Sequence, residues 1–149
     1  MTAKIAKRQT ERDFVIVCPV MPSDASVADA LAALYYLPPY YRLVLLEEVL
    51  QSPELSSFLS DDAISDRLSF ETEQGLHSAA SPCFYADVLV QNAGDRLYAN
   101  FPLPRITVNG TVDGDVVSQP HKDFAVSSHR PEALASALLQ LNRSLLFQT

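Results

Sequence analysis

The stretch VADALAALYYLPPYYRLVLLEE, residues 27 to 48, decides the fold. Its first part continues a pattern of apolar side chains at helical spacing that covers residues 25 to 37. Pro38 and Pro39 end this helix, because proline lacks the N–H group and restricts the residue before it. The apolar run over residues 41 to 47 is typical of a strand that is buried on both faces. A helix, a corner and a buried strand in this order predict one step of a parallel βαβ sheet.

The same patterns recur along the chain. Strands and helices alternate at spacings of about 20 to 25 residues, which favours right-handed crossovers and a mainly parallel sheet. We therefore expect an α/β fold, a Rossmann-like three-layer sandwich with a single domain over residues 13–149, after a basic polar leader over residues 1–12. The expected further strands cover residues 13–20, 66–71, 85–91, 116–117 and 123–127; helices are expected from Ser52, over 129–146 and, as a poor helix, around 97–108.

Composition and charge exclude several classes of function. Of the 149 residues, 48% are hydrophobic and 19% are charged, which is typical of a folded domain. The formal net charge of −7 argues against a general nucleic-acid-binding protein, because neutralising phosphates needs clustered Lys and Arg. No apolar run approaches the ~18 residues that span a bilayer, so no membrane span is expected. The leader lacks the apolar core of a signal peptide, which makes cytoplasmic the expected localisation.

Motifs for common chemistries are missing from the sequence. It contains no GxGxxG, no GxxxxGK[ST] and no GxSxG, so dinucleotide, P-loop and serine hydrolase sites have no support. His77, His121 and His129 do not have the spacing of metal ligands on one helix face. Cys18 and Cys83 are interpreted as two reduced thiols, with a disulfide as the alternative. We expect no catalytic residue, no metal and no cofactor.

Three segments in order resemble a known family. Residues 33 to 46 read ALYYLPPYYRLVLL, residues 85 to 90 read YADVLV, and residues 130 to 138 read RPEALASAL. Together they resemble the C-terminal, nucleotide-sugar-binding half of retaining glycosyltransferases with the GT-B architecture, in the family of sucrose and glycogen synthases. The resemblance covers roughly residues 13 to 143 and depends on the order and spacing of the segments.

The departures from that family fall on the residues that carry its chemistry. The resemblance implies that an Arg and a Lys that bind the donor diphosphate would stand at Pro19 and Ala25, and that a glycine would stand at Glu47. Two glutamates of the family correspond to Leu97 and Arg105. A carboxylate at position 47 would repel a diphosphate by about 1 kcal/mol in water-like surroundings and by several kcal/mol when desolvated. The resemblance thus implies an eroded donor site.

The resemblance covers only one of the two halves of this architecture, and the acceptor-binding groups of the family lie on the other half. The first hypothesis is a non-catalytic glycosyltransferase-like domain, a pseudoenzyme, that associates with itself or with a glycosyltransferase partner chain. The alternative is a glycosyltransferase, or a subunit of one, that binds a nucleotide sugar in an altered crevice; a small-molecule-binding regulator is a third hypothesis.

An association function needs an interface. The prolines at 38 and 39 are flanked by tyrosines, which are efficient interface anchors, although a packed helix end is the simpler interpretation of such a cluster. A lone half would also leave apolar loop residues bare at the carboxyl edge of the sheet. An oligomer burying on the order of 1,200 Å² is expected. The candidate interface residues are Tyr35, Tyr36, Tyr40, Tyr41, Met21 and Phe101, with Val20 and Leu103 beside them.

Overall fold

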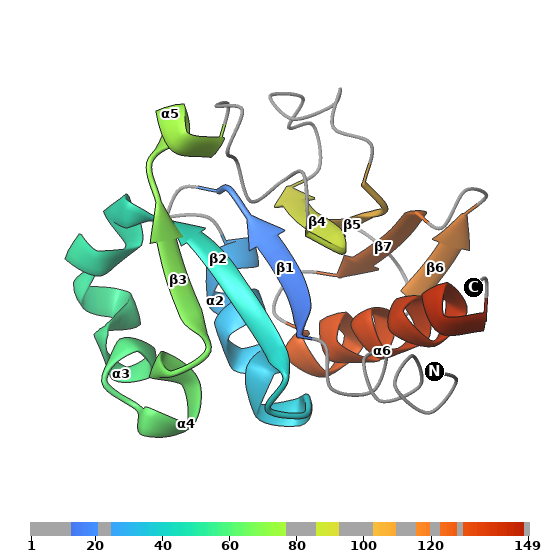
Figure 1. Ribbon diagram of the computed structural model, residues 1–149, viewed down its shortest axis with the longest axis horizontal. Coiled ribbons are helices and arrows are strands. Elements are labelled where there is room, and N and C mark those ends of the chain that lie inside the picture. The colour runs from blue at the N-terminus through green and yellow to red at the C-terminus, as the bar shows by residue number, and fades with distance from the viewer. Residues whose placement is uncertain are drawn as a thin grey trace, which may run out of the picture.

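Seven strands form one sheet in the order β3-β2-β1-β4-β5-β7-β6 (Figure 1). The computed structural model describes residues 13–20, 25–76, 86–92, 103–109, 116–119, 123–127 and 130–147. Neighbouring strands are parallel, except that β6 runs antiparallel to β7. The order 3-2-1-4-5 is that of doubly wound Rossmann sheets. The strands are β1 Phe14–Cys18, β2 Tyr41–Leu46, β3 Leu68–Glu71, β4 Val88–Asn92, β5 Arg105–Asn109, β6 Val116–Gln119 and β7 Asp123–Ser127.

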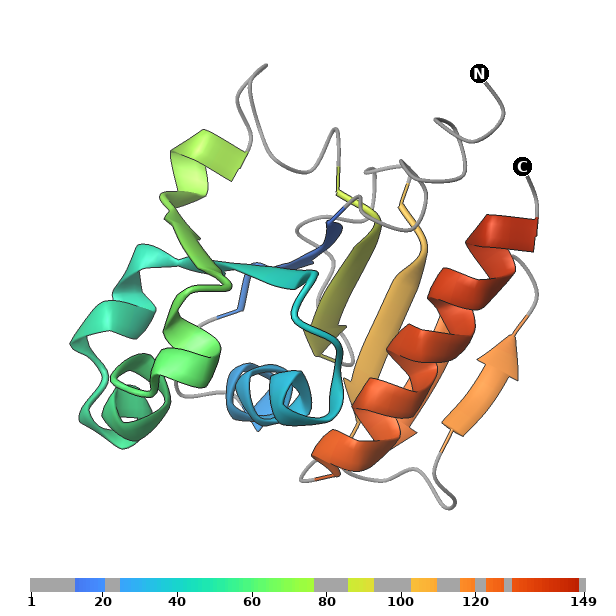
Figure 2. The same ribbon diagram turned by 60° about the horizontal axis from the view of Figure 1, so that its bottom comes forward.

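Helices cover the two faces of the sheet unequally. Figure 2 shows α2 and α6 on the same face of the sheet, with α3 and α4 near the β3 end. Leu76 of α5 packs on the opposite face, so the described part of that layer is thin. The helices are α2 Ala25–Ala33, α3 Ser56–Leu59, α4 Asp62–Ser65, α5 Glu73–Leu76 and α6 Pro131–Phe147, with the 3₁₀ helices η1 Leu34–Tyr36, η2 Glu47–Gln51 and η3 Pro53–Leu55.

The central strands bury side chains on both faces. Ile16 and Leu43 point into the larger cluster with α2 and α6, whereas Val17 and Val44 belong to the smaller cluster on the other face. Both faces are apolar, so the sequence of these strands is a continuous apolar run and shows no alternation. This two-sided burial explains why β1 and β2 could be predicted from the sequence.

The predicted Rossmann-like α/β sandwich with a mainly parallel sheet is confirmed. The expected strands at residues 13–20, 41–47 and 85–91 correspond to β1, β2 and β4, and the last expected helix corresponds to α6. The helix expected over residues 25–37 is α2 continued by η1.

The poor helix predicted around residues 97–108 is wrong for its last part, which is β5. Ile106 and Val108 are buried on the helix-covered face, and this period of two is that of a strand. The β-branched run Ile106, Thr107 and Val108 favours a strand, and Pro104 lies in the segment where the helix was expected.

The single helix predicted from Ser52 is divided into η3 and α3, and a further short helix, α4, follows it. Ser52 occupies the N-cap position of η3 without a side-chain cap hydrogen bond. Asp61 supplies such a cap to α4, because its Oδ1 accepts the N–H of Ala63 at 3.0 Å.

Several expectations fall on residues outside the described ranges. These residues are the leader 1–12, Met21, the three histidines, Cys83, Leu97 and Phe101. Among the helices that the structure describes, none has the length and apolar character needed to cross a membrane.

Candidate functional site

The carboxyl edge of the sheet carries two of the residues singled out by the sequence. Cys18 lies opposite Leu45 in the parallel register of β1 and β2, so the chain leaves both strands at the same edge. Pro19 follows β1 and is buried, and Glu47 follows β2 and is exposed. Ala25 begins α2, the helix after β1. A parallel sheet of this order offers a ligand crevice at the carboxyl ends of its strands where the order reverses, between β1 and β4. Next to this point, the residues that follow β1 and β2 are a proline and a carboxylate.

Arg105 lies on the face of the sheet opposite α2 and α6. It is the first residue of β5 and pairs with Leu89 of β4, which in turn pairs with Val17 of β1. Val17 lies one residue before the end of β1. Its Nη1 donates to Gln91 Oε1 at 3.2 Å, and Gln91 Nε2 donates to Thr107 Oγ1 at 3.3 Å. The structure thus brings Pro19 and Glu47 to one edge and holds Arg105 two strands away from β1.

A groove of about 270 Å³ lies on the same face, over β1, β2 and β3. Its floor includes Val15, which is half-buried, and Val44, which is 7% exposed. Polar and charged side chains surround these valines. The lining residues are Asp13, Val15, Arg42, Val44, Ser69, Phe70 and Glu71.

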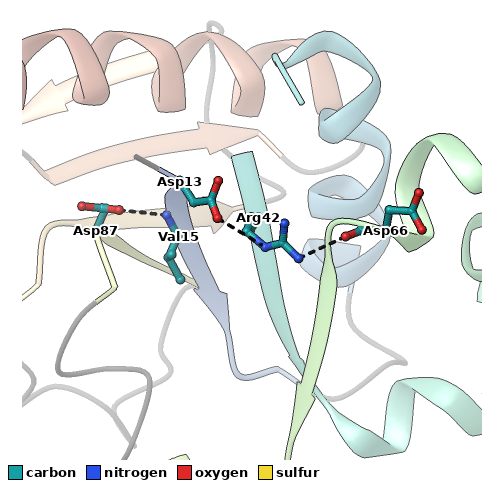
Figure 3. A network of polar contacts seen from close by, with 5 residues as sticks. All are labelled: Asp13, Val15, Arg42, Asp66 and Asp87. Carbon is teal, nitrogen blue, oxygen red and sulfur yellow. Dashed lines mark hydrogen bonds and ion pairs between the residues drawn. The ribbon is translucent and has the colours of Figure 1, made fainter. Parts of the chain in front are cut away.

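The cationic side chain of this groove, that of Arg42, contacts residues that precede the two strands next to β2 (Figure 3). Arg42 Nε lies 3.8 Å from Asp13 Oδ2, and Arg42 Nη2 donates to the backbone oxygen of Asp66 at 3.1 Å. Exposed pairs of this kind contribute about 0–1 kcal/mol to stability. The network orients the guanidinium rather than supplying much free energy.

Asp87 is a structural carboxylate that sequence reasoning missed. It is 8% exposed, and its Oδ2 accepts the N–H of Val15 at 2.8 Å (Figure 3). The N–H of Asp87 in turn donates to Val15 O at 2.8 Å. The available signal was a lone acidic residue directly before the apolar strand β4.

The four tyrosines of the corner between η1 and β2 separate into two groups. Tyr35 is 50% exposed and Tyr36 is 58% exposed. Tyr40 is half-buried, and Tyr41 is fully buried with its ring 4.9 Å from that of Phe14. The surface available to a partner is therefore that of Tyr35 and Tyr36, which we call the tyrosine corner.

One arginine bonds three backbone carbonyls that flank the tyrosine corner. Arg67 Nη1 donates to Leu34 O at 2.8 Å, to Leu37 O at 3.1 Å and to Pro38 O at 3.4 Å. Arg67 immediately precedes β3, so the edge of the sheet fixes the conformation of the corner.

Tyr35 is also held by its side chain. Its hydroxyl donates to the carboxylate of Asp61, and its ring lies 6.3 Å from that of Phe58. This hydrogen bond raises the pKa of Tyr35 and lowers the pKa of Asp61. Tyr36 is the next residue in the chain and the more exposed of the two tyrosines.

Metal and thiol chemistry find no support in the described residues. In the ranges that the structure describes, no group of three or more His, Cys, Asp or Glu side chains could hold a metal ion. Cys18 is buried within β1. The geometry offers three candidate surfaces, namely the carboxyl edge, the groove and the tyrosine corner.

Comparison of the chain with models of protein families, with characterised proteins and with solved structures gives no match. Function is therefore inferred from the residues and their arrangement.

Proposed function

We propose that this chain is a non-catalytic glycosyltransferase-like domain that acts by binding another protein through the tyrosine corner. The observation that carries the proposal is the exposure of two consecutive tyrosines, at 50% and 58%, on a backbone fixed by Arg67. Tyrosine rings offer a large contact area and lose few rotatable bonds on binding. A surface that is already ordered loses less conformational entropy when a partner binds, which favours association.

The carboxyl edge supports the non-catalytic part of the proposal. The resemblance would place a donor diphosphate beside Pro19 and Glu47, which follow adjacent strands. Pro19 has no charge and no N–H group to offer, and Glu47 has the wrong charge. Catalysis of glycosyl transfer by this chain alone would require a cationic or metal-bound diphosphate site, which these two residues do not supply.

A photocrosslinking experiment tests the association. A photoreactive phenylalanine analogue replaces Tyr36 in the full chain, and a matched control carries it at Ser57, which is also exposed. We expect one protein to be crosslinked in the native cell from position 36 and not from position 57. Equal labelling from both positions, or none from either, would contradict a binding role for the tyrosine corner.

A second candidate function is the binding of a nucleotide sugar in an altered crevice. It is favoured by the polar row Arg105, Gln91 and Thr107, whose side chains face the same side of the sheet. A thermal-shift panel of UDP, GDP and ADP sugars separates the two candidates. A ligand at a hundredfold excess over its Kd stabilises a protein by about 2.7 kcal/mol, a shift of several degrees for a domain of this size. The association proposal expects no such shift.

A further inference from the structure

The strand β3 is one of the two edges of the sheet and leaves backbone groups without a strand partner (Figure 1). Leu43 lies opposite Leu68, and Leu43 N–H donates to Arg67 O at 2.9 Å. In a parallel ladder the backbone of Ser69 therefore faces β2, and the N–H and C=O of Leu68 and Phe70 face outward. Within the described residues, no hydrogen bond reaches these four outward groups.

The sequence of this edge is self-complementary about Ser69. Residues 67 to 71 read Arg-Leu-Ser-Phe-Glu, so a cation and a carboxylate lie two positions on either side of Ser69 and apolar residues lie one position away. When such a segment pairs antiparallel with its own copy about Ser69, Arg67 lies across from the partner's Glu71. Because the guanidinium of Arg67 is bonded to the carbonyl oxygens of Leu34, Leu37 and Pro38, this arrangement avoids like charges across the strand pair, which would be destabilising, and no new ion pair is needed.

The same register also satisfies the outward backbone groups. Leu68 lies across from the partner's Phe70, and the two residues exchange both of their N–H to C=O bonds as a hydrogen-bonded pair. Twofold symmetry repeats this exchange, so all four outward groups on each copy are satisfied. The hydrogen-bond phase thus selects this register, and the order of charges is compatible with it.

We propose that β3 pairs antiparallel with β3 of a second copy of this chain, with the twofold axis at Ser69. The side chain of Ser69 is exposed, and residues 68 to 71 contain neither proline nor lysine, which commonly protect edge strands. Closed twofold pairing uses the same edge of both copies and stops at the dimer. Ser69, Phe70 and Glu71 also line the groove on the second face, so the pairing joins two such grooves across the axis.

This inference names a partner and a surface that differ from those of the proposed function. The tyrosine corner binds a different protein, whereas β3 binds a second copy. The variants at Ser69 and the crosslinks from Tyr36 therefore test the two proposals independently, and a negative result in one experiment leaves the other proposal standing.

Charge substitutions at Ser69 test the pairing. In the dimer the two copies of residue 69 form a non-hydrogen-bonded pair with Cα atoms about 4.5 Å apart. Ser69→Glu and Ser69→Lys each place like charges at this position and are expected to weaken self-association by about tenfold or more. An equimolar mixture of the two variants should recover a dimer, which a folding defect could not produce. Ser136→Glu and Ser136→Lys, exposed on α6, serve as matched controls.

A cysteine at the axis gives a second readout. Ser69→Cys in the full chain should form a disulfide-linked dimer under mild oxidation, because the expected Cα separation lies within the range for disulfides. Ser136→Cys should not. Light scattering that shows a monomer at millimolar concentration, a dimer that persists equally in both charge variants, or equal crosslinking from the two cysteines would overturn the proposal.

Discussion

Asp87 and Val15 are joined by two hydrogen bonds of 2.8 Å that run in opposite directions. The carboxylate of Asp87 accepts from the N–H of Val15, and its own N–H donates to Val15 O. Directly before β4 begins, the side chain of Asp87 accepts the hydrogen bond that a backbone carbonyl would accept within a strand ladder. The pairing of β1 with β4 determines the order of the strands, since it lies where the chain reverses its direction across the sheet.

Removal of this carboxylate should destabilise the fold. Asp87→Ala leaves the N–H of Val15 without its acceptor, and we expect the free energy of unfolding to fall by about 1.5–3 kcal/mol. Asp87→Asn keeps an acceptor oxygen and should lose less. Urea unfolding followed by circular dichroism measures both, with Asp62→Ala as the exposed control. An unfolding free energy for Asp87→Ala within the error of the control would contradict a structural role.

Arg67 should prove equally sensitive, because one guanidinium serves three carbonyl oxygens of the corner. Arg67→Ala is expected to lower the free energy of unfolding by about 2 kcal/mol, since hydrogen bonds from a charged donor are removed. Arg67→Lys keeps the charge but not the planar fork and should recover part of the loss. Hydrogen exchange at residues 34–41 should accelerate in Arg67→Ala, and Arg143→Ala, exposed on α6, is the control. Unchanged exchange at the corner would show that other contacts hold it.

The elements that could be predicted from the sequence are those whose pattern is local. β1 and β2 are continuous apolar runs, and α6 has an apolar stripe behind Pro131. In the segment 105–108, which the sequence assigns to the end of a poor helix, Arg105 and Thr107 alternate with only two buried residues. This pattern is too short to distinguish the period of a strand from that of a helix.

The polar contacts could not be predicted because they depend on tertiary register. Arg67 contacts Leu34 across 33 positions, and Asp87 contacts Val15 across 72 positions. The sequence marks both residues only as charged groups next to strands. The position of Arg105 also depends on tertiary register. Arg105 lies two strands from β1 because β4 pairs with β5, and its spacing in sequence from Glu47 does not determine this position.

The hydrogen bond from Tyr35 to Asp61 should be visible in the titration of the carboxyl group. This bond and the N–H of Ala63 lower the pKa of Asp61 below 3.8. A lowered folded-state pKa gives stability that is present above the unfolded value and is lost as the pH falls through the folded value. Tyr35→Phe should raise the pKa of Asp61 toward its ordinary value, as measured by carbon NMR of the carboxyl group. The pKa of Glu132, which Arg130 lowers, is the internal control and should not move.

Tyr41 should make stability sensitive to alkaline pH. Its burial raises the pKa of its hydroxyl to about 12, although the hydrogen bond from Asn142 Nδ2 at 2.9 Å opposes the shift. The folded state therefore holds this proton more tightly than the unfolded state, so the contribution is complete below pH 10.0 and is lost as the pH rises toward about 12.

Tyr41→Phe should remove that loss and flatten the dependence of unfolding free energy on pH above 10.0. At neutral pH it should cost about 1 kcal/mol, because the hydrogen bond with Asn142 is gone. Urea unfolding at a series of pH values measures both effects. Tyr36→Phe, at an exposed ring, should retain the alkaline slope of the parent chain, and an equal slope in Tyr41→Phe would contradict the assignment.

Reversal of the charge at Glu47 tests whether the carboxyl edge is an eroded diphosphate site. Glu47 is exposed directly after β2, so Glu47→Lys should leave the fold intact. The repulsion of a phosphate group in water-like surroundings becomes an attraction of similar size, about 1 kcal/mol each, and UDP affinity should rise about tenfold or more. Isothermal titration calorimetry with UDP measures the gain, and Glu54→Lys, exposed on η3, shows how much of it comes from net charge alone. An equal gain in UDP affinity in both variants would mean that the carboxyl edge is not a former diphosphate site. The resemblance to the glycosyltransferase half would then lose its chemical support.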